Sequence, residues 1–163
     1  MVKYADGPTE EVEIEVDAPA SAIWPLVSDI DMPARFSEEF QGGEWLDGAG
    51  PALGSRFRGR NHHPVVGEWV TECTVVECEP ERAFGWAVGD VANATATWRF
   101  ELEQVGERTR LRMSARMGPG PSGLTPAIEA RPDREDDIVE RRLGEWRTNM
   151  TATVEGMKDI AEG

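Results

Sequence analysis

Long hydrophobic runs are missing from this chain of 163 residues, and cysteine, histidine and lysine each occur only twice. No apolar stretch approaches the roughly 18 residues that a membrane-spanning helix needs, so we expect no membrane insertion. Cys73 and Cys78 are too few for a disulfide framework, and on one strand they would point to opposite faces. The adjacent His62 and His63 would likewise diverge, which disfavours a zinc site. The composition therefore predicts no disulfide, no metal and no cofactor.

Basic residues are outnumbered, because 31 acidic side chains face 17 basic ones and the formal net charge is -14. Such a field repels phosphate backbones and anionic lipid surfaces, so we expect no nucleic-acid partner. Residues 1–7 contain no apolar signal-peptide core, and we expect a cytoplasmic protein. The length suits a single domain, 1–163, which can bury about two-thirds of its unfolded surface.

Apolar and polar residues alternate along much of the first two-thirds of the chain. This alternation is typical of half-buried strands, whose successive side chains point to opposite faces. It predicts a first strand at 12–16 and a series of strands from about 40 to 117, with the clearest alternation at 94–103. Short Gly-, Pro- or Asp-containing turns separate these strands, which indicates an antiparallel meander.

Helical patterns lie on either side of the predicted series of strands. Asp17-Ala18-Pro19 resembles a capped helix start, and Pro25 should kink or end the helix that follows, giving two short turns. A long amphipathic helix is expected at about 133–160, with apolar residues every three or four positions. Gly144 and Gly156 interrupt it at a cost of about 1 kcal/mol each relative to alanine, which suggests close packing on the sheet.

A curved sheet against a long helix has a concave face that is either hollow or filled by side chains. The residues expected on this face alternate between bulky aromatic rings and small side chains. That mixture is compatible with a ligand cavity and equally with a solid, interdigitated core. Asn61, Thr71 and His63 would orient the polar end of a guest. The residues that we expect to line the cavity and bind the guest are Phe57, Asn61, His63, Trp69, Thr71, Trp86, Trp98, Met113, Arg142, Trp146 and Met150.

Few side chains are candidates for chemistry. His63 is either a general acid or base at the cavity mouth or a strand-end histidine bonded to water. Cys73 has no basic neighbour on its strand face, so we interpret it as a small buried hydrophobe. Arg142 and Glu145 either face the ligand or form an exposed pair. Residues 118–123 match G-x-G-x-x-G, but prolines remove backbone donors and no βαβ unit surrounds them, so we expect a loop beside the cavity instead.

Several stretches together resemble a known family. They are Asp17-Ala18-Pro19 with Ile23-Trp24 and Val27-Ser28-Asp29, Gly67-Glu68-Trp69 with Cys73-Thr74-Val75, Glu79-Pro80 with Phe84, Ala96-Thr97-Trp98-Arg99-Phe100, and the closing stretch from Arg142 to Met150. The sequence is similar to the START-like (SRPBCC) superfamily, in the group named for polyketide cyclases and dehydrases. The resemblance implies an α+β helix-grip fold. In that fold a curved seven-stranded antiparallel sheet wraps around a long C-terminal helix, with two short helices after the first strand.

Members of this superfamily resemble one another in holding a lipid, polyketide, hormone or similar apolar molecule between sheet and helix. The resemblance therefore implies binding of a small hydrophobic or amphipathic molecule. The alternative is a polyketide cyclase, aromatase or dehydratase acting on a bound poly-keto substrate, and a third option is a partner-binding role with a closed core. The group shares no universal catalytic residue, so none is carried over. A homodimer is left open.

Overall fold

The computed structural model describes residues 2–163 and contains one seven-stranded antiparallel sheet in the order β1-β7-β6-β5-β4-β3-β2. The strands are β1 (Thr9–Val16), β2 (Phe40–Trp45), β3 (Arg56–His63), β4 (Gly67–Glu79), β5 (Ala83–Val88), β6 (Ala96–Val105) and β7 (Arg108–Met117). The α-helices are α1 (Ala20–Val27), α2 (Leu124–Ala130) and α3 (Glu135–Glu162). This architecture confirms the predicted α+β helix-grip fold, with α1 and a 3-10 turn at Met32–Arg35 as the two short helices.

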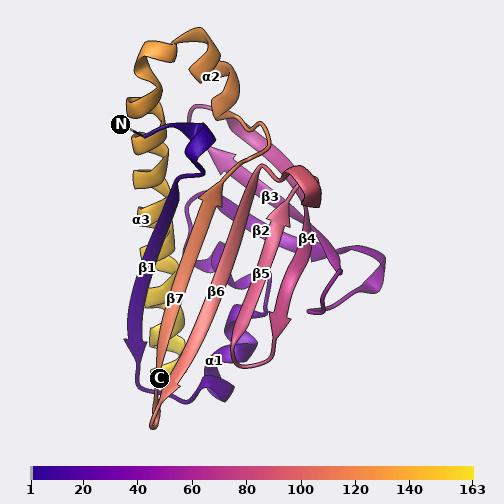
Figure 1. The fold of residues 1–163 in the computed structure, drawn as a ribbon. Helices are drawn as coiled ribbons and strands as arrows, with labels where there is room; N and C mark the ends of the chain where they lie inside the picture. The colour runs from indigo at the N-terminus through magenta and orange to yellow at the C-terminus, as the bar shows by residue number, and fades with distance from the viewer. Residues whose placement is uncertain (1) are drawn as a thin grey trace.

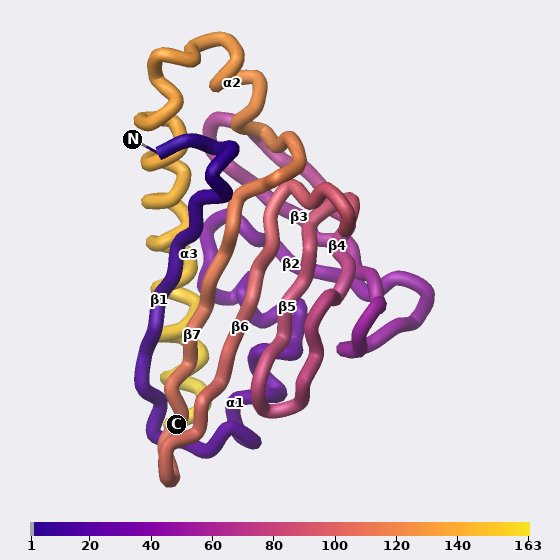
Figure 2. Tube along the Cα trace, viewed as in Figure 1, coloured from indigo at the N-terminus to yellow at the C-terminus, as the bar shows by residue number. Residues whose placement is uncertain are grey.

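The sheet bends around the long C-terminal helix. α3 runs beside β1 and β7, while β2 and β3 cross the view behind β5 and β6 (Figure 1). The chain trace shows α1 near one end of the sheet and α2 near the opposite end (Figure 2). The β1–β7 side of the sheet therefore packs most closely on α3.

Two clusters of buried side chains hold this arrangement together. The larger one joins α1 and α3 to β1, β6 and β7, with Val16, Ile23 and Leu111 completely buried. The smaller one lies on β3, β4 and β5 and includes Phe57 and Phe84. The partly buried Trp24, Trp86 and Val88 pack against both clusters and connect them.

The prediction that Pro25 breaks the first helix is wrong. α1 is one continuous helix of eight residues with Pro25 inside it. A proline at this position removes the hydrogen bond to the carbonyl of Ser21, four residues earlier. Ser21 is exposed, so water can satisfy that carbonyl, and the helix continues for only two more residues.

The prediction that a side-chain oxygen of Asp17 accepts the cap hydrogen bond of α1 is also wrong. The N-cap residue is Pro19, and Asp17 makes no side-chain cap hydrogen bond. Instead, the amide of Ala20 donates to Oε1 of Gln104 at 3.0 Å, and the amide of Asp17 donates to Oε2 of Glu162 at 2.7 Å. The start of α1 is therefore fixed by tertiary contacts and not by its own sequence.

The two glycines of α3 have different surroundings. A Cβ atom on Gly156 would lie 2.3 to 2.6 Å from ring atoms of Phe36, whereas a Cβ atom on Gly144 would meet nothing within 4 Å. The expectation of close packing is therefore wrong for Gly144. At Gly156 the close partner is Phe36, which follows the 3-10 turn, and not the sheet.

We expect Gly144→Ala and Gly156→Ala to change stability in opposite directions. Gly144→Ala should raise the free energy of unfolding by about 1 kcal/mol through helix propensity alone. Gly156→Ala gains the same propensity but forces the Phe36 ring aside, and overpacking of this kind costs about 1–3 kcal/mol. Urea unfolding followed by circular dichroism measures both changes. Equal stabilisation by the two substitutions would show that Phe36 does not pack on α3.

Candidate functional site

A cavity of about 650 Å³ lies between the concave face of the sheet and α3. Its walls are mostly apolar and draw on both buried clusters, so the interior is hollow between them. The structure brings all of the residues predicted for the cavity to its walls: Phe57, Asn61, His63, Trp69, Thr71, Trp86, Trp98, Met113, Arg142, Trp146 and Met150.

Aromatic rings form much of the wall and contact one another edge-on or at a tilt. The Trp86 ring centroid lies 5.9 Å from that of Phe57 and 6.1 Å from that of Phe100. Trp98 on β6 and Trp146 on α3 bring their ring centroids within 4.8 Å, which joins sheet and helix. The N–H of Trp146 is buried and has no hydrogen-bond partner among the described residues. This part of the wall is thus mostly apolar.

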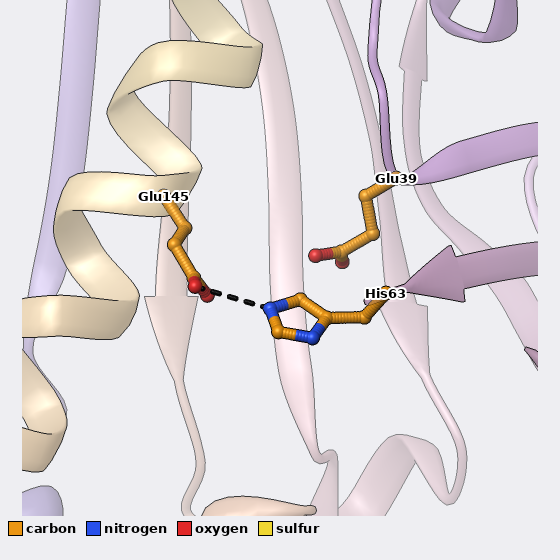
Figure 3. A group of neighbouring side chains, drawn as sticks. All are labelled: Glu39, His63 and Glu145. Carbon is orange, nitrogen blue, oxygen red and sulfur yellow. Dashed lines mark hydrogen bonds and ion pairs between the residues drawn. The ribbon is translucent and has the colours of Figure 1, made fainter. Parts of the chain in front are cut away.

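Four polar side chains, Glu39, His63, Arg142 and Glu145, interrupt this apolar wall, and we call them the polar cluster. Arg142 donates to both carboxylate oxygens of Glu39, at 2.6 and 2.7 Å, and to Oε1 of Glu145 at 2.9 Å. Glu145 reaches from α3 toward His63 at the end of β3, and Glu39 lies just before β2 (Figure 3). Arg142 and Glu145 share one face of α3 because three residues separate them. The cluster therefore links α3 to the β2–β3 side of the sheet.

Hydrogen bonds indicate the tautomer of the neutral His63 ring. The amide of Val65 donates to Nδ1 at 3.1 Å, and Nε2 lies 3.1 Å from Oε2 of Glu145. Since Nδ1 accepts, the proton of the neutral ring is on Nε2 and is donated to Glu145. The interpretation of His63 as a histidine bonded only to water is therefore wrong, and both of its ring nitrogens are occupied.

Glu145 and Arg142 are both charged at neutral pH. Burial acts to raise the pKa of Glu145, but hydrogen bonds from Arg142 and His63 outweigh it and hold the pKa below its ordinary value. Burial acts to lower the pKa of Arg142, but its bonds to Glu39 and Glu145 outweigh burial and raise the pKa. The side chain of Arg142 is 18% exposed and that of Glu145 is 32% exposed. Of the two alternatives, the structure agrees with side chains that face the cavity and not with an exposed pair.

The polar cluster brings together three groups that can ligate a metal. Ligand atoms of Glu39, His63 and Glu145 all lie within 4.8 Å of one another. Sequence reasoning missed this grouping because 103 residues separate Glu39 from Arg142 and 82 separate His63 from Glu145. Arg142 already binds both carboxylates, and its positive charge would oppose a cation there. We therefore assign no metal site.

Cys73 also lines the cavity but is a poor nucleophile. Burial raises its pKa to about 11, although a contact of 3.8 Å from its Sγ to the hydroxyl of Thr71 acts in the opposite direction. The thiol is therefore protonated at neutral pH. Asn61 donates to the same Thr71 hydroxyl at 3.5 Å, so Asn61 and Thr71 form a second, uncharged polar spot on the wall.

The Gly/Pro loop at 118–123 borders the cavity through Ser122 and Gly123. It is fastened to the rest of the molecule, because Tyr4 donates from its hydroxyl to the carbonyl of Gly120 at 2.6 Å. The amide of Gly120 donates in turn to the carbonyl of Ala94 at 2.8 Å. The loop thus forms part of the cavity wall, as expected from its position in the sequence.

A helix-grip fold around a largely apolar cavity defines a protein of the START-like (SRPBCC) superfamily. Within it, the chain belongs to the family described as polyketide cyclase / dehydrase and lipid transport, whose model matches residues 9–158. No curated protein sequence shows a significant match. Within residues 2–163, none of the helices is long and apolar enough to span a membrane.

Solved structures with the same fold cover nearly the whole chain. The Polyketide_cyc-like protein Cgl2372 from Corynebacterium glutamicum is 30% identical with a TM-score of 0.68, over 94% of this chain and 91% of its own. The di-domain ARO/CYC BexL from the BE-7585A biosynthetic pathway is 18% identical with a TM-score of 0.72, over 96% of this chain and 50% of its own. TTHA0849 from Thermus thermophilus is 14% identical with a TM-score of 0.60, over 94% of this chain and 97% of its own. The last two similarities are evidence of fold alone.

Proposed function

We propose that this protein binds a small hydrophobic or amphipathic molecule, of lipid or polyketide type, in the cavity between the sheet and α3. The observation that carries the proposal is the cavity volume of about 650 Å³ behind mostly apolar walls. Cavities for small molecules typically have roughly 300–1,000 Å³, apolar walls and a few polar groups that orient the guest. The aromatic rings would cover the apolar part of the guest, and the two polar spots would receive its polar end.

Native mass spectrometry of freshly purified protein tests the proposal most directly, because a retained guest adds its mass. A second measurement uses the neutral dye Nile red, whose emission rises in apolar surroundings. Four of the six tryptophans line the cavity, so we also expect the bound dye to quench tryptophan fluorescence.

A cavity-filling substitution with a matched control localises the binding. Thr71→Phe places a ring inside the cavity, whereas Thr97→Phe adds the same ring on β6 outside the residues that line it. We expect Thr71→Phe to weaken uptake of Nile red at least tenfold and Thr97→Phe to leave it unchanged. Wild-type protein that retains no guest and takes up no dye would contradict the proposal and favour a core closed in solution.

A cyclase or dehydratase acting on a bound poly-keto chain is the second candidate. The pair of His63 and Glu145 on the cavity wall favours it, because an imidazole beside a carboxylate can transfer protons. The family description includes cyclases and dehydrases, and BexL is described as an ARO/CYC. A linear poly-β-keto thioester that cyclises or loses water faster with the protein than without it would favour this candidate over a binding role alone.

A further inference from the structure

Most of the hydrogen-bond donors of the polar cluster are already in use, because three of the five N–H groups of Arg142 and the one N–H of the neutral His63 ring bond to carboxylates. Both terminal nitrogens of Arg142 donate to carboxylates of Glu39 and Glu145. The Nε2 proton of His63 is donated to Glu145, and Nδ1 of the same ring accepts from Val65. The positive charge of Arg142 is therefore already paired with two carboxylates, which disfavours its binding of an anionic head group.

The hydrogen-bond acceptors of the cluster are only partly in use. An ionised carboxylate offers about four lone-pair positions. Glu145 accepts one hydrogen bond from Arg142 and one from His63, and Glu39 accepts two from Arg142. Each carboxylate thus keeps about half of its acceptor capacity, so more acceptor positions than donors remain at this end of the cavity.

The net charge of the polar cluster also disfavours a negatively charged guest. Two carboxylates and one guanidinium give it a formal charge of one negative unit when His63 is neutral. The other charged residues on the cavity wall are Asp29 and Arg141, which are exposed and cancel one another. A guest carboxylate would add a third negative group in a partly buried place, within a chain of net charge -14.

From this arrangement we infer that the cavity selects guests whose polar end donates hydrogen bonds, an alcohol, a phenol or a protonated amine, and discriminates against carboxylates. Glu145 is the specificity-determining residue, because it presents free acceptor positions to the cavity. His63 positions its carboxylate, since it fixes Oε2 from the opposite side. The inference rests on the proposed binding function and identifies the class of guest.

Three guests with the same alkyl chain test the inference: 1-dodecanol, dodecylamine and dodecanoate. Each is titrated against bound Nile red at neutral pH, the alcohol below its solubility limit and the two ionic guests below their critical micelle concentrations. A salt concentration of 0.15 M limits the general field of the acidic chain to about 8 Å, so the amine is not favoured by distant charges. We expect dodecanol and dodecylamine to displace the dye at concentrations at least tenfold lower than dodecanoate. The alcohol separates hydrogen bonding from charge, because it is neutral.

A charge-neutralising variant then assigns the selectivity to the cluster. Glu145→Gln keeps the shape of the side chain but removes its charge. We expect this variant to prefer dodecanol and dodecylamine over dodecanoate by less than about threefold. The matched control is Glu140→Gln, an exposed position on the same helix that does not line the cavity, which should keep the full preference. Glu39→Gln removes the other carboxylate, and it replaces Glu145→Gln if that variant does not fold.

The outcomes separate the inference from the proposed function. If dodecanoate displaces the dye at the same concentration as dodecanol, the inference is overturned and the binding function stays intact. The same holds if the dye binds but none of the three guests displaces it. A preference that persists unchanged in Glu145→Gln and Glu39→Gln also overturns it. Absence of any dye uptake by the wild type overturns the proposed function, and the inference with it.

Discussion

Replacing Phe100 by alanine should lower the free energy of unfolding by about 3–5 kcal/mol. Phe100 lies on β6 with only 1% of its surface exposed, and its ring contacts that of Trp86 with 6.1 Å between centroids. The substitution loses the transfer free energy of the ring and leaves a void that the stiff sheet cannot close. Urea unfolding followed by circular dichroism gives the difference between variant and wild type.

Trp98→Ala is the matched comparison, because Trp98 lies two residues earlier on the same face of β6. The Trp98 ring lines the cavity and is only partly buried, so part of its surface already faces open space. We therefore expect a smaller loss, of about 2 kcal/mol, which includes the contact with Trp146. A loss for Trp98→Ala equal to or greater than that for Phe100→Ala would mean that side chains fill the cavity in solution.

The strands and their facing residues could be predicted from the sequence because their signal is local. A strand reverses the direction of its side chains at every residue, so the alternation from Phe57 to His63 already separates the inward from the outward face. The same holds for the apolar stripe of α3, which recurs with the helical period from Val139 to Met157. In the structure the inward side chains of Phe57 and His63 line the cavity, whereas Val139 and Met157 at the two ends of the stripe lie in the larger buried cluster.

The polar cluster could not be predicted, because its bonds join residues far apart in the chain. Glu39 lies in an irregular segment without periodicity, and its partner Arg142 is 103 residues away. No local pattern shows that this segment closes against α3. The cap of α1 by Gln104 was missed for the same reason, since the donor and acceptor are 84 residues apart. Residue types indicated which side chains are polar, but only the closed fold shows which of them pair.

Arg142→Met should be the most destabilising change in the polar cluster, with a loss of about 2–3 kcal/mol at pH 7. Methionine keeps the apolar stem of the side chain but removes the guanidinium that neutralises Glu39 and Glu145. Breaking a buried pair costs about 3–5 kcal/mol because it leaves an unpaired charge, and the partial exposure here places the loss at or below the lower limit. The control is Arg141→Met, at an exposed neighbouring position, which should change stability by less than about 0.5 kcal/mol.

The pH dependence of the stability difference between wild type and Arg142→Met shows whether the charge of Arg142 causes this loss. In the wild type the pKa of Glu145 is lowered, so its contribution to stability is present above its unfolded pKa of about 4.3 and disappears as the pH falls through the folded value. Without Arg142, burial and the nearby carboxylate of Glu39 oppose ionisation of Glu145, so the pKa of Glu145 rises and the group gains a proton on folding as the pH falls. The difference in unfolding free energy between wild type and Arg142→Met should therefore shrink from pH 7 to pH 4 in urea titrations. A difference that stays constant over this range would mean that Arg142 acts by packing on the ring of Trp146, 6.0 Å from its guanidinium carbon, and not through its charge.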